Sequence, residues 1–164
     1  MTARTAIFLL ALLPAAAAAA PAAAPETAKF VPHYMSQRPA LAGLREGPSY
    51  DHKVLWVYRH KGYPFHVIAS FDIWRRVQAA DGTLGWMSVS MLSDNRTVLV
   101  TGKGRAEIRA SADPAAKLVG LADADAILGL KTCVADMCRV AADGIDGWIA
   151  RARIWGVGAD EAFK

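Results

Sequence analysis

The residues of this sequence that could do chemistry are two cysteines, four histidines and a set of aromatic rings. Cys133 and Cys138 are separated by four residues. If they lie at facing ends of a hairpin, their β-carbons come within reach of a disulfide, and we predict that bond. A redox-active pair would favour Cys-x-x-Cys spacing before a helix start, and zinc would need a second pair of ligands. The sequence has neither feature, so we predict a structural disulfide.

Catalysis finds little support in these residue types. A cysteine hydrolase needs a base beside its nucleophile and a third group to orient that base. Both cysteines are predicted to be paired, and no histidine follows either of them. His60 and His66 flank a turn and could in principle share a metal, and the alternative is two exposed turn histidines. We expect no enzymatic activity, no cofactor and no metal site.

Aromatic side chains are concentrated between residues 50 and 86. They are Tyr50, Trp56, Tyr58, Tyr63, Phe65, Phe71, Trp74 and Trp86, with Trp148 and Trp155 further on. Alternation along strands predicts that Phe65, Trp86 and Trp148 point inward. A small domain cannot bury all the remaining rings, so some should line a surface groove that stacks on sugars or extended peptides.

We expect this groove to be lined by four rings, with two guanidinium groups offering charge to a carboxylate. The predicted rings are Tyr50, Trp56, Tyr63 and Trp74, and the predicted guanidinium groups are Arg45 and Arg75. The alternative is that these rings only cover an interface between two parts of the chain.

The elements that must position these residues occur twice. Residues 76–86 (RVQAADGTLGW) return as residues 139–148 (RVAADGIDGW). In both copies a strand end runs into an Asp-Gly turn, which is a hairpin signal, and Gly-Trp then opens the next strand. The repeat predicts two similar units.

Short β-branched and aromatic runs between turn residues predict strands throughout both copies. The clearest are residues 54–59, 64–70, 73–79 and 85–89 in the first copy, and 97–101, 106–109, 117–121, 125–130, 137–141 and 147–150 in the second. No periodic segment of helix length lies between them. The sequence therefore predicts an all-β protein of two small barrels with about five short strands each.

The start of the chain differs in composition from the rest. Arg4 precedes an apolar run at residues 7–13 and a string of alanines, an order typical of a secretory signal. The run is too short for a bilayer span, which takes about 20 residues. We expect a signal peptide at 1–20, a tether and lead-in at 21–38, domains at 39–92 and 97–156 with a linker at 93–96, and a tail at 157–164.

The net charge of the chain argues against one class of partner. The formal net charge of the chain is +4, and without Arg4 it is about +3, with 18 basic residues facing 15 acidic ones. This excess is too small and too scattered to predict a nucleic-acid partner. It suits the anionic surface of a cell envelope.

The chain resembles the bacterial SH3-like domains, in particular exported proteins with two tandem copies. The resemblance rests on Leu44-Arg45-Glu46-Gly47-Pro48-Ser49, Lys61-Gly62, Trp74-Arg75-Arg76-Val77 and Gly85-Trp86. The second copy keeps Ile108-Arg109, Arg139-Val140 and Gly147-Trp148. It has Ala110-Ser111-Ala112 in place of Glu46-Gly47-Pro48, Asp125 in place of Gly62, and Met137 in place of Trp74. These departures weigh against a ligand role for the second copy, but not against its fold.

The resemblance implies two β-barrels with a non-enzymatic binding role, and exported members are commonly linked to peptidoglycan or envelope partners. Two functions follow. The first is a periplasmic module that binds cell-wall glycan or peptide in the aromatic groove. The second is a scaffold that presents the barrels to an envelope protein, for example by accepting a partner strand at an exposed sheet edge.

Overall fold

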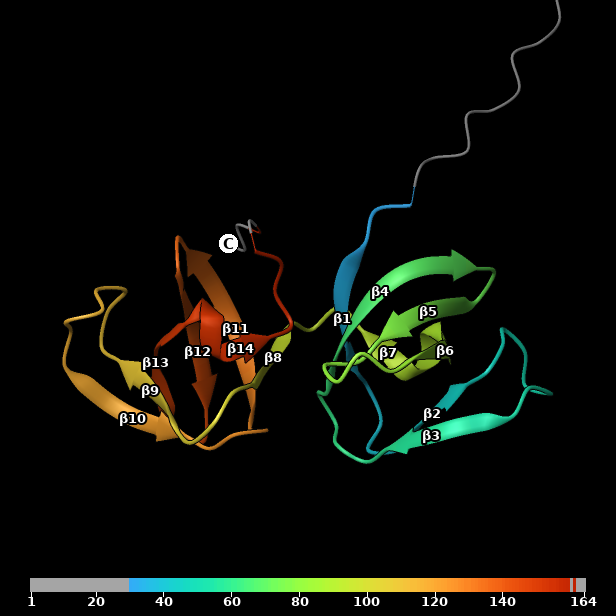
Figure 1. Cartoon of the computed structure of the whole chain (residues 1–164), viewed down its shortest axis with the longest axis horizontal. Helices are drawn as coiled ribbons and strands as arrows, with labels where there is room; N and C mark the ends of the chain where they lie inside the picture. Colours follow the sequence, from blue (N-terminus) through green and yellow to red (C-terminus); the bar gives the residue numbers. More distant parts are fainter. Residues whose placement is uncertain (1–29, 160, 162–164) are drawn as a thin grey trace, which may run out of the picture.

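A computed structural model describes residues 30–159 and 161. Within these residues the chain forms two seven-stranded antiparallel sheets and two short 3-10 turns, with no α-helix (Figure 1). The prediction of an all-β protein built from two tandem units is therefore confirmed. The predicted signal peptide at 1–20, and the tether up to residue 29, lie outside the described residues.

The first unit is the sheet of strands β1–β7. Its order is β3-β2-β6-β5-β4-β1-β7. The strands are β1 (His33–Gln37), β2 (Ala42–Arg45), β3 (Val54–Tyr58), β4 (Pro64–Phe71), β5 (Trp74–Gln78), β6 (Leu84–Ser88) and β7 (Leu92–Ser93), with the 3-10 turn η1 (Val89–Met91) between the last two.

The second unit repeats this arrangement with every strand number raised by seven. Its order is β10-β9-β13-β12-β11-β8-β14. The strands are β8 (Thr97–Val100), β9 (Ala106–Arg109), β10 (Leu118–Ala122), β11 (Ile127–Val134), β12 (Met137–Ala142), β13 (Ile145–Ala150) and β14 (Ile154–Trp155), with η2 (Arg151–Arg153) before the last. The duplicated sequence motif thus corresponds to a duplicated sheet.

Seven strands per unit exceed the five that we predicted. In the first unit, the lead-in does not precede the sheet but forms β1, which pairs with β4 on one side and β7 on the other. Met35, Ser36 and Gln37 are buried there. Pro32 and Pro39 lie outside the strand, where they remove no hydrogen bond from the ladder. The first sheet therefore begins at His33, before the boundary expected at residue 39.

The turns repeat as well. Gly62 and Asp125 both have left-handed backbones, with φ of 85° and 64°, so the aspartate does occupy the position of the glycine. In the second unit Asp143 and Gly144 both have positive φ and join Ala142 to Ile145 as a two-residue hairpin loop, as an Asp-Gly pair favours.

Each unit has its own apolar core, and the prediction that Trp86 and Trp148 point into these cores is wrong. Trp86 and Trp148 are only half-buried, whereas their neighbours Met87 and Ile149 are fully buried. The cause is the period of two along a strand. Gly85 turns its hydrogen inward against the Leu44 side chain, so Met87 shares its inward face and Trp86 faces outward.

The two units lie side by side, with β1 and β8 near their junction (Figure 1). Trp155 of the second unit meets the Tyr34 ring of the first edge-on, with ring centroids 5.5 Å apart. Gly156 approaches Pro64 so closely that an added β-carbon would lie 3.1 Å from the proline Cβ. No helix in the described part of the chain is both long and apolar enough to cross a bilayer.

Candidate functional site

Three of the predicted site residues come together at the loop between β2 and β3. The Tyr50 ring is 61% exposed and meets the edge of the Trp74 ring with centroids 4.9 Å apart. Trp74 itself is only 5% exposed. The Arg45 guanidinium lies 5.4 Å from the Tyr50 ring centroid, within the range of a cation–π contact. Tyr50 is therefore the ring that faces solvent, and Trp74 supports it from below.

The two predicted arginines, Arg45 and Arg75, both donate hydrogen bonds to backbone carbonyls of nearby turns. Arg45 Nη1 donates to the carbonyls of Tyr50 and His52 at 2.9 and 2.7 Å, which holds the loop in shape. In the second unit, Arg109 Nη1 likewise donates to the Ala116 carbonyl at 2.8 Å. Arg75 Nη1 donates to the Asp72 and Trp74 carbonyls across the β4–β5 turn. Because Arg109 repeats the bond without the rings, loop support is a function of Arg45 that needs no ligand.

Trp56 lies on β3, the edge strand of the first sheet, and is 61% exposed. Among the described residues its ring makes no contact with the Tyr50 or Trp74 rings. Val54, Leu55 and Val57 beside it are exposed too. The predicted rings thus form two neighbouring features of the same β2–β3 hairpin, and not one continuous groove.

Tyr63 lies apart from both features, where the two units meet. Its half-buried ring packs on Tyr58 and Phe65, with centroids 4.9 and 5.0 Å away. Burial raises the pKa of Tyr63, and the nearby carboxylates of Asp81 and Asp125 add to the rise. For this one ring the alternative prediction, an interface position, describes its location.

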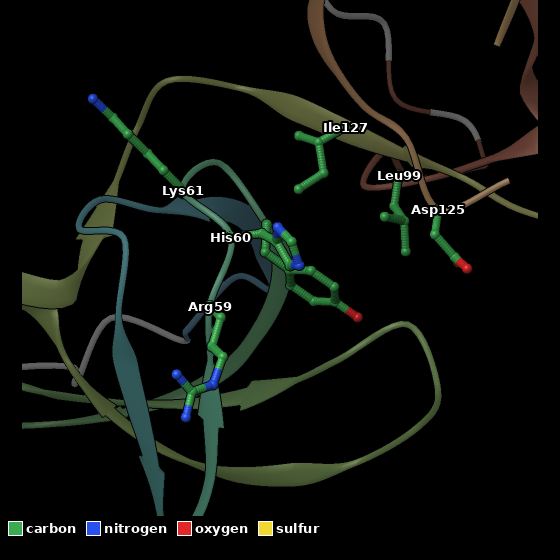
Figure 2. A pocket seen from close by; sticks show the side chains of 7 residues that line it. Arg59, His60, Lys61, Leu99, Asp125 and Ile127 are labelled. Atoms are coloured by element: carbon green, nitrogen blue, oxygen red, sulfur yellow. The ribbon is translucent and has the colours of Figure 1, made fainter. Parts of the chain in front are cut away.

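Tyr63 also lines a pocket of about 430 Å³ between the units. The other lining residues are Arg59, His60 and Lys61 of the first unit and Leu99, Asp125 and Ile127 of the second (Figure 2). Sequence reasoning missed this pocket as a site. The available signals were the basic run at residues 59–61 and an aspartate in the position of Gly62.

A model of the bacterial SH3 domain matches residues 38–94 and again residues 102–156. The chain belongs to the bacterial SH3 domain family. The resemblance seen in the sequence is therefore confirmed, and each unit is one SH3 domain. No curated protein matches the chain.

Two solved structures from Trichomonas vaginalis are similar to this pair of SH3 domains. One is NlpC2, with 13% sequence identity over 76% of this chain and 48% of that chain, and the other is NlpC1, with 12% identity over 79% and 47%. Both have a TM-score of 0.35. This chain spans about half the length of either, and a likeness at this level carries no inference about activity.

The histidines at the ends of the β3–β4 turn of the first SH3 domain face different surroundings. His60 lines the pocket, whereas the His66 ring stacks on Tyr34 at 4.7 Å and 24°. Within residues 30–159 and 161, no three His, Cys, Asp or Glu side chains are grouped so as to hold a metal ion. Cys133 and Cys138 face each other across the β11–β12 hairpin and form the predicted disulfide.

Proposed function

We propose that this protein is a non-catalytic binding module of the cell envelope that engages peptidoglycan through the exposed rings of its first SH3 domain. The observation that carries the proposal is a difference between the two domains. Tyr50 and Trp56 are each 61% exposed, and the aligned positions of the second domain hold Pro114 and Gly120. The first domain thus displays two large rings that its otherwise parallel partner lacks.

Exposed rings suit this ligand class for a physical reason. Ring faces stack on the apolar faces of sugars and on extended peptides, and a buried support holds them at low entropic cost. Trp74 supplies that support beneath Tyr50. Arg45 uses Nη1 for the loop carbonyls, and its remaining donors suit a peptide carboxylate. Arg75 would add positive charge nearby.

The proposed location rests on the signal-like composition of residues 1–20 and not on the fold. A signal peptide at 1–20 would export the protein to the periplasm, where peptidoglycan is within reach. Exported members of the family are commonly linked to peptidoglycan, which agrees with this location. Both cysteines are in the disulfide, so neither supplies a thiolate nucleophile, in keeping with a binding role.

Retention on purified sacculi tests the proposal. We expect the wild-type protein to sediment with sacculi, and Tyr50→Ala and Trp56→Ala each to weaken retention at least fivefold. Leu41→Ala is the control, because Leu41 is another exposed apolar residue of the first domain, at 56%, and the proposed site does not include it. Circular dichroism should show all three variants folded. Absence of wild-type retention, or equal losses in all three variants, would refute the proposal.

A second candidate function, the envelope scaffold, is favoured by the edge of the first sheet. Strand β3 pairs with β2 on one side only and exposes four consecutive apolar residues, Val54–Val57. Such an edge is a ready site for an added strand. Lys53 and Arg59 flank the run, so the partner that fits is an apolar strand with acidic flanks. A second copy would set like charges against each other.

A synthetic peptide can test this second function. We would titrate a Val-Thr-Val-Thr-Val peptide with glutamate flanks and follow backbone amide shifts by NMR. Strand addition predicts shifts along β3 and at least tenfold weaker binding when the flanks are lysine. Equal binding of both peptides, or shifts confined to other strands, would exclude it.

A further inference from the structure

The pocket between the SH3 domains has walls of opposite charge. Arg59, His60 and Lys61 follow one another along the β3–β4 connection of the first domain, and Asp125 lies on the opposite side of the pocket, in the second domain (Figure 2). Leu99, Ile127 and the Tyr63 ring supply an apolar lining. A volume of about 430 Å³ lies within the range of roughly 300–1,000 Å³ that small-ligand pockets occupy.

Three charged side chains of the pocket are unpaired within the part of the chain that the structure describes. The side chains of Arg59, Lys61 and Asp125 make no hydrogen bond or ion pair to any described residue. Elsewhere on the second domain, arginines and aspartates do pair, as Arg139 does with Asp146 at 2.6 Å. The pocket charges are thus held apart across a space, which leaves them available to a ligand that carries both signs.

Tyr63 adds a directional polar group to this space. Its hydroxyl oxygen accepts a long hydrogen bond, 3.4 Å, from the Ala80 amide. The hydroxyl proton has no acceptor among the residues that the structure describes, so it can be donated to a bound carboxylate. In Figure 2 the Arg59 guanidinium and the Lys61 ammonium both extend away from Asp125, so the flexible Arg59 side chain has to turn toward the pocket to meet an anion held by the Tyr63 hydroxyl.

The walls of the pocket are fixed by the packing of the two domains. The Gly62 turn lies against the second domain, and an added β-carbon there would sit 3.4 Å from Ile127 Cγ2. Thr97 donates a hydrogen bond to the Gly62 carbonyl and lies 2.6 Å from the Ser36 hydroxyl. A preformed site loses less free energy on binding than one that must be assembled.

We propose that this pocket binds a small zwitterion, a free amino acid or a short peptide that carries both a free carboxylate and a free ammonium group. The carboxylate lies toward Arg59 and the Tyr63 hydroxyl, and the ammonium group lies toward Asp125. The apolar part of the ligand packs on Leu99 and Ile127. This site does not depend on wall binding by Tyr50 and Trp56, because neither residue lines the pocket.

Calorimetric titration of the purified full chain with the dipeptide alanyl-leucine tests the site. We expect saturable binding of the free-ended dipeptide. N-acetylation should weaken binding at least tenfold because Asp125 loses its cation, and C-terminal amidation should do the same because Arg59 loses its anion. Absence of saturable binding, or equal binding of all three peptides, would overturn the proposal.

Two variants locate the binding. Asp125→Asn should weaken the free-ended dipeptide at least tenfold and remove the preference over the acetylated form. Asparagine tolerates the left-handed backbone at φ 64°, so the variant should fold. Arg59→Gln should remove the preference over the amide.

Matched controls separate this site from the rest of the protein. Asp123→Asn removes a nearby carboxylate that pairs with Arg105, and Arg76→Gln removes an exposed cation of the first domain; both should bind like the wild type. Asp125→Asn should keep its retention on sacculi, so failure of one proposal can be told from failure of the other. Equal affinity in Asp125→Asn and the wild type would refute the pocket.

Discussion

The side-chain hydroxyl of Ser36 lies 2.6 Å from that of Thr97, and this contact joins β1 to β8, the corresponding strands of the two SH3 domains. Thr97 gives its single hydroxyl proton to the Gly62 carbonyl. Ser36 must therefore donate to Thr97, since a hydroxyl has only one proton to give. A short chain of hydrogen bonds thus runs from the first domain into the second and back.

We predict that Thr97→Val lowers the free energy of unfolding by about 1–3 kcal/mol, because both the Ser36 hydroxyl and the Gly62 carbonyl lose a partner. Thr97→Ser keeps the hydroxyl and should cost less than half as much. Urea unfolding followed by circular dichroism measures both. A loss in Thr97→Ser as large as that in Thr97→Val would contradict the prediction, because serine keeps the hydroxyl group that makes both hydrogen bonds.

We predict that Gly85→Ala destabilises the first SH3 domain. An added β-carbon would lie 2.5 Å from Leu44 Cγ and 2.8 Å from the Arg45 carbonyl oxygen. Leu44 is fully buried and has no room to retreat. Gly85→Ala should therefore cost about 1–3 kcal/mol of stability through overpacking.

Gly43→Ala is the control for that substitution. Its β-carbon would meet only Val54, with Cγ1 at 3.6 Å and Cγ2 at 3.8 Å, which are ordinary contact distances. Thermal unfolding should show a lowered Tm for Gly85→Ala and a Tm close to the wild type for Gly43→Ala. A similar drop in both would mean that glycine flexibility in β-strands, and not the Leu44 contact, is what matters.

The fold was accessible from the sequence because its signals are local and occur twice. The Asp-Gly turns and the Gly-Trp strand starts lie within a dozen residues of each other, and the second copy supports the first. The disulfide was accessible for the same reason, since its two cysteines are only five positions apart in the sequence. Strand β1 was missed because its partners β4 and β7 are distant in sequence.

The candidate site was less accessible because alternation fixes the face of a side chain but not its distance to other side chains. Tyr50 and Trp74 meet across 24 positions of sequence, while Trp56 and Tyr63 lie elsewhere. Alternation predicts an inward Trp86 only if the phase of the strand is known, and the inward Gly85 sets the opposite phase. Packing between the two domains creates the pocket at Asp125, and its two sequence signals, the basic run at residues 59–61 and the aspartate in place of Gly62, do not show that they meet.

The disulfide should stabilise the second domain measurably. Replacing Cys133 and Cys138 together by alanine should lower the free energy of unfolding by about 2 kcal/mol on the chain-entropy model for so short a loop. Both side chains are buried, so alanine avoids burying new hydroxyl groups. Dithiothreitol should destabilise the wild type by a similar amount and leave the double variant unchanged. Two titratable thiols in the oxidised wild type would contradict the prediction.

His66 should make stability depend on pH at the junction of the domains. Burial lowers the pKa of His66 below its ordinary 6.5, and the charge of nearby His33 adds to the effect. The folded state thus favours the neutral ring stacked on Tyr34, while the unfolded chain takes up a proton more readily. Its contribution to stability is therefore complete above about pH 6.5 and is lost as the pH falls through the lower folded pKa.

His66→Phe tests this dependence because it keeps a ring against Tyr34 and removes the titration. We expect urea unfolding between pH 8 and pH 5 to show a shallower loss of stability in the variant than in the wild type. At pH 8 the histidine is neutral in both the folded and the unfolded state. The difference in unfolding free energy between wild type and variant at that pH therefore gives the effect of changing the ring itself. Parallel stability curves for the two proteins would show that the pH dependence comes from other groups, because the only titrating group removed is the one at the Tyr34 stack.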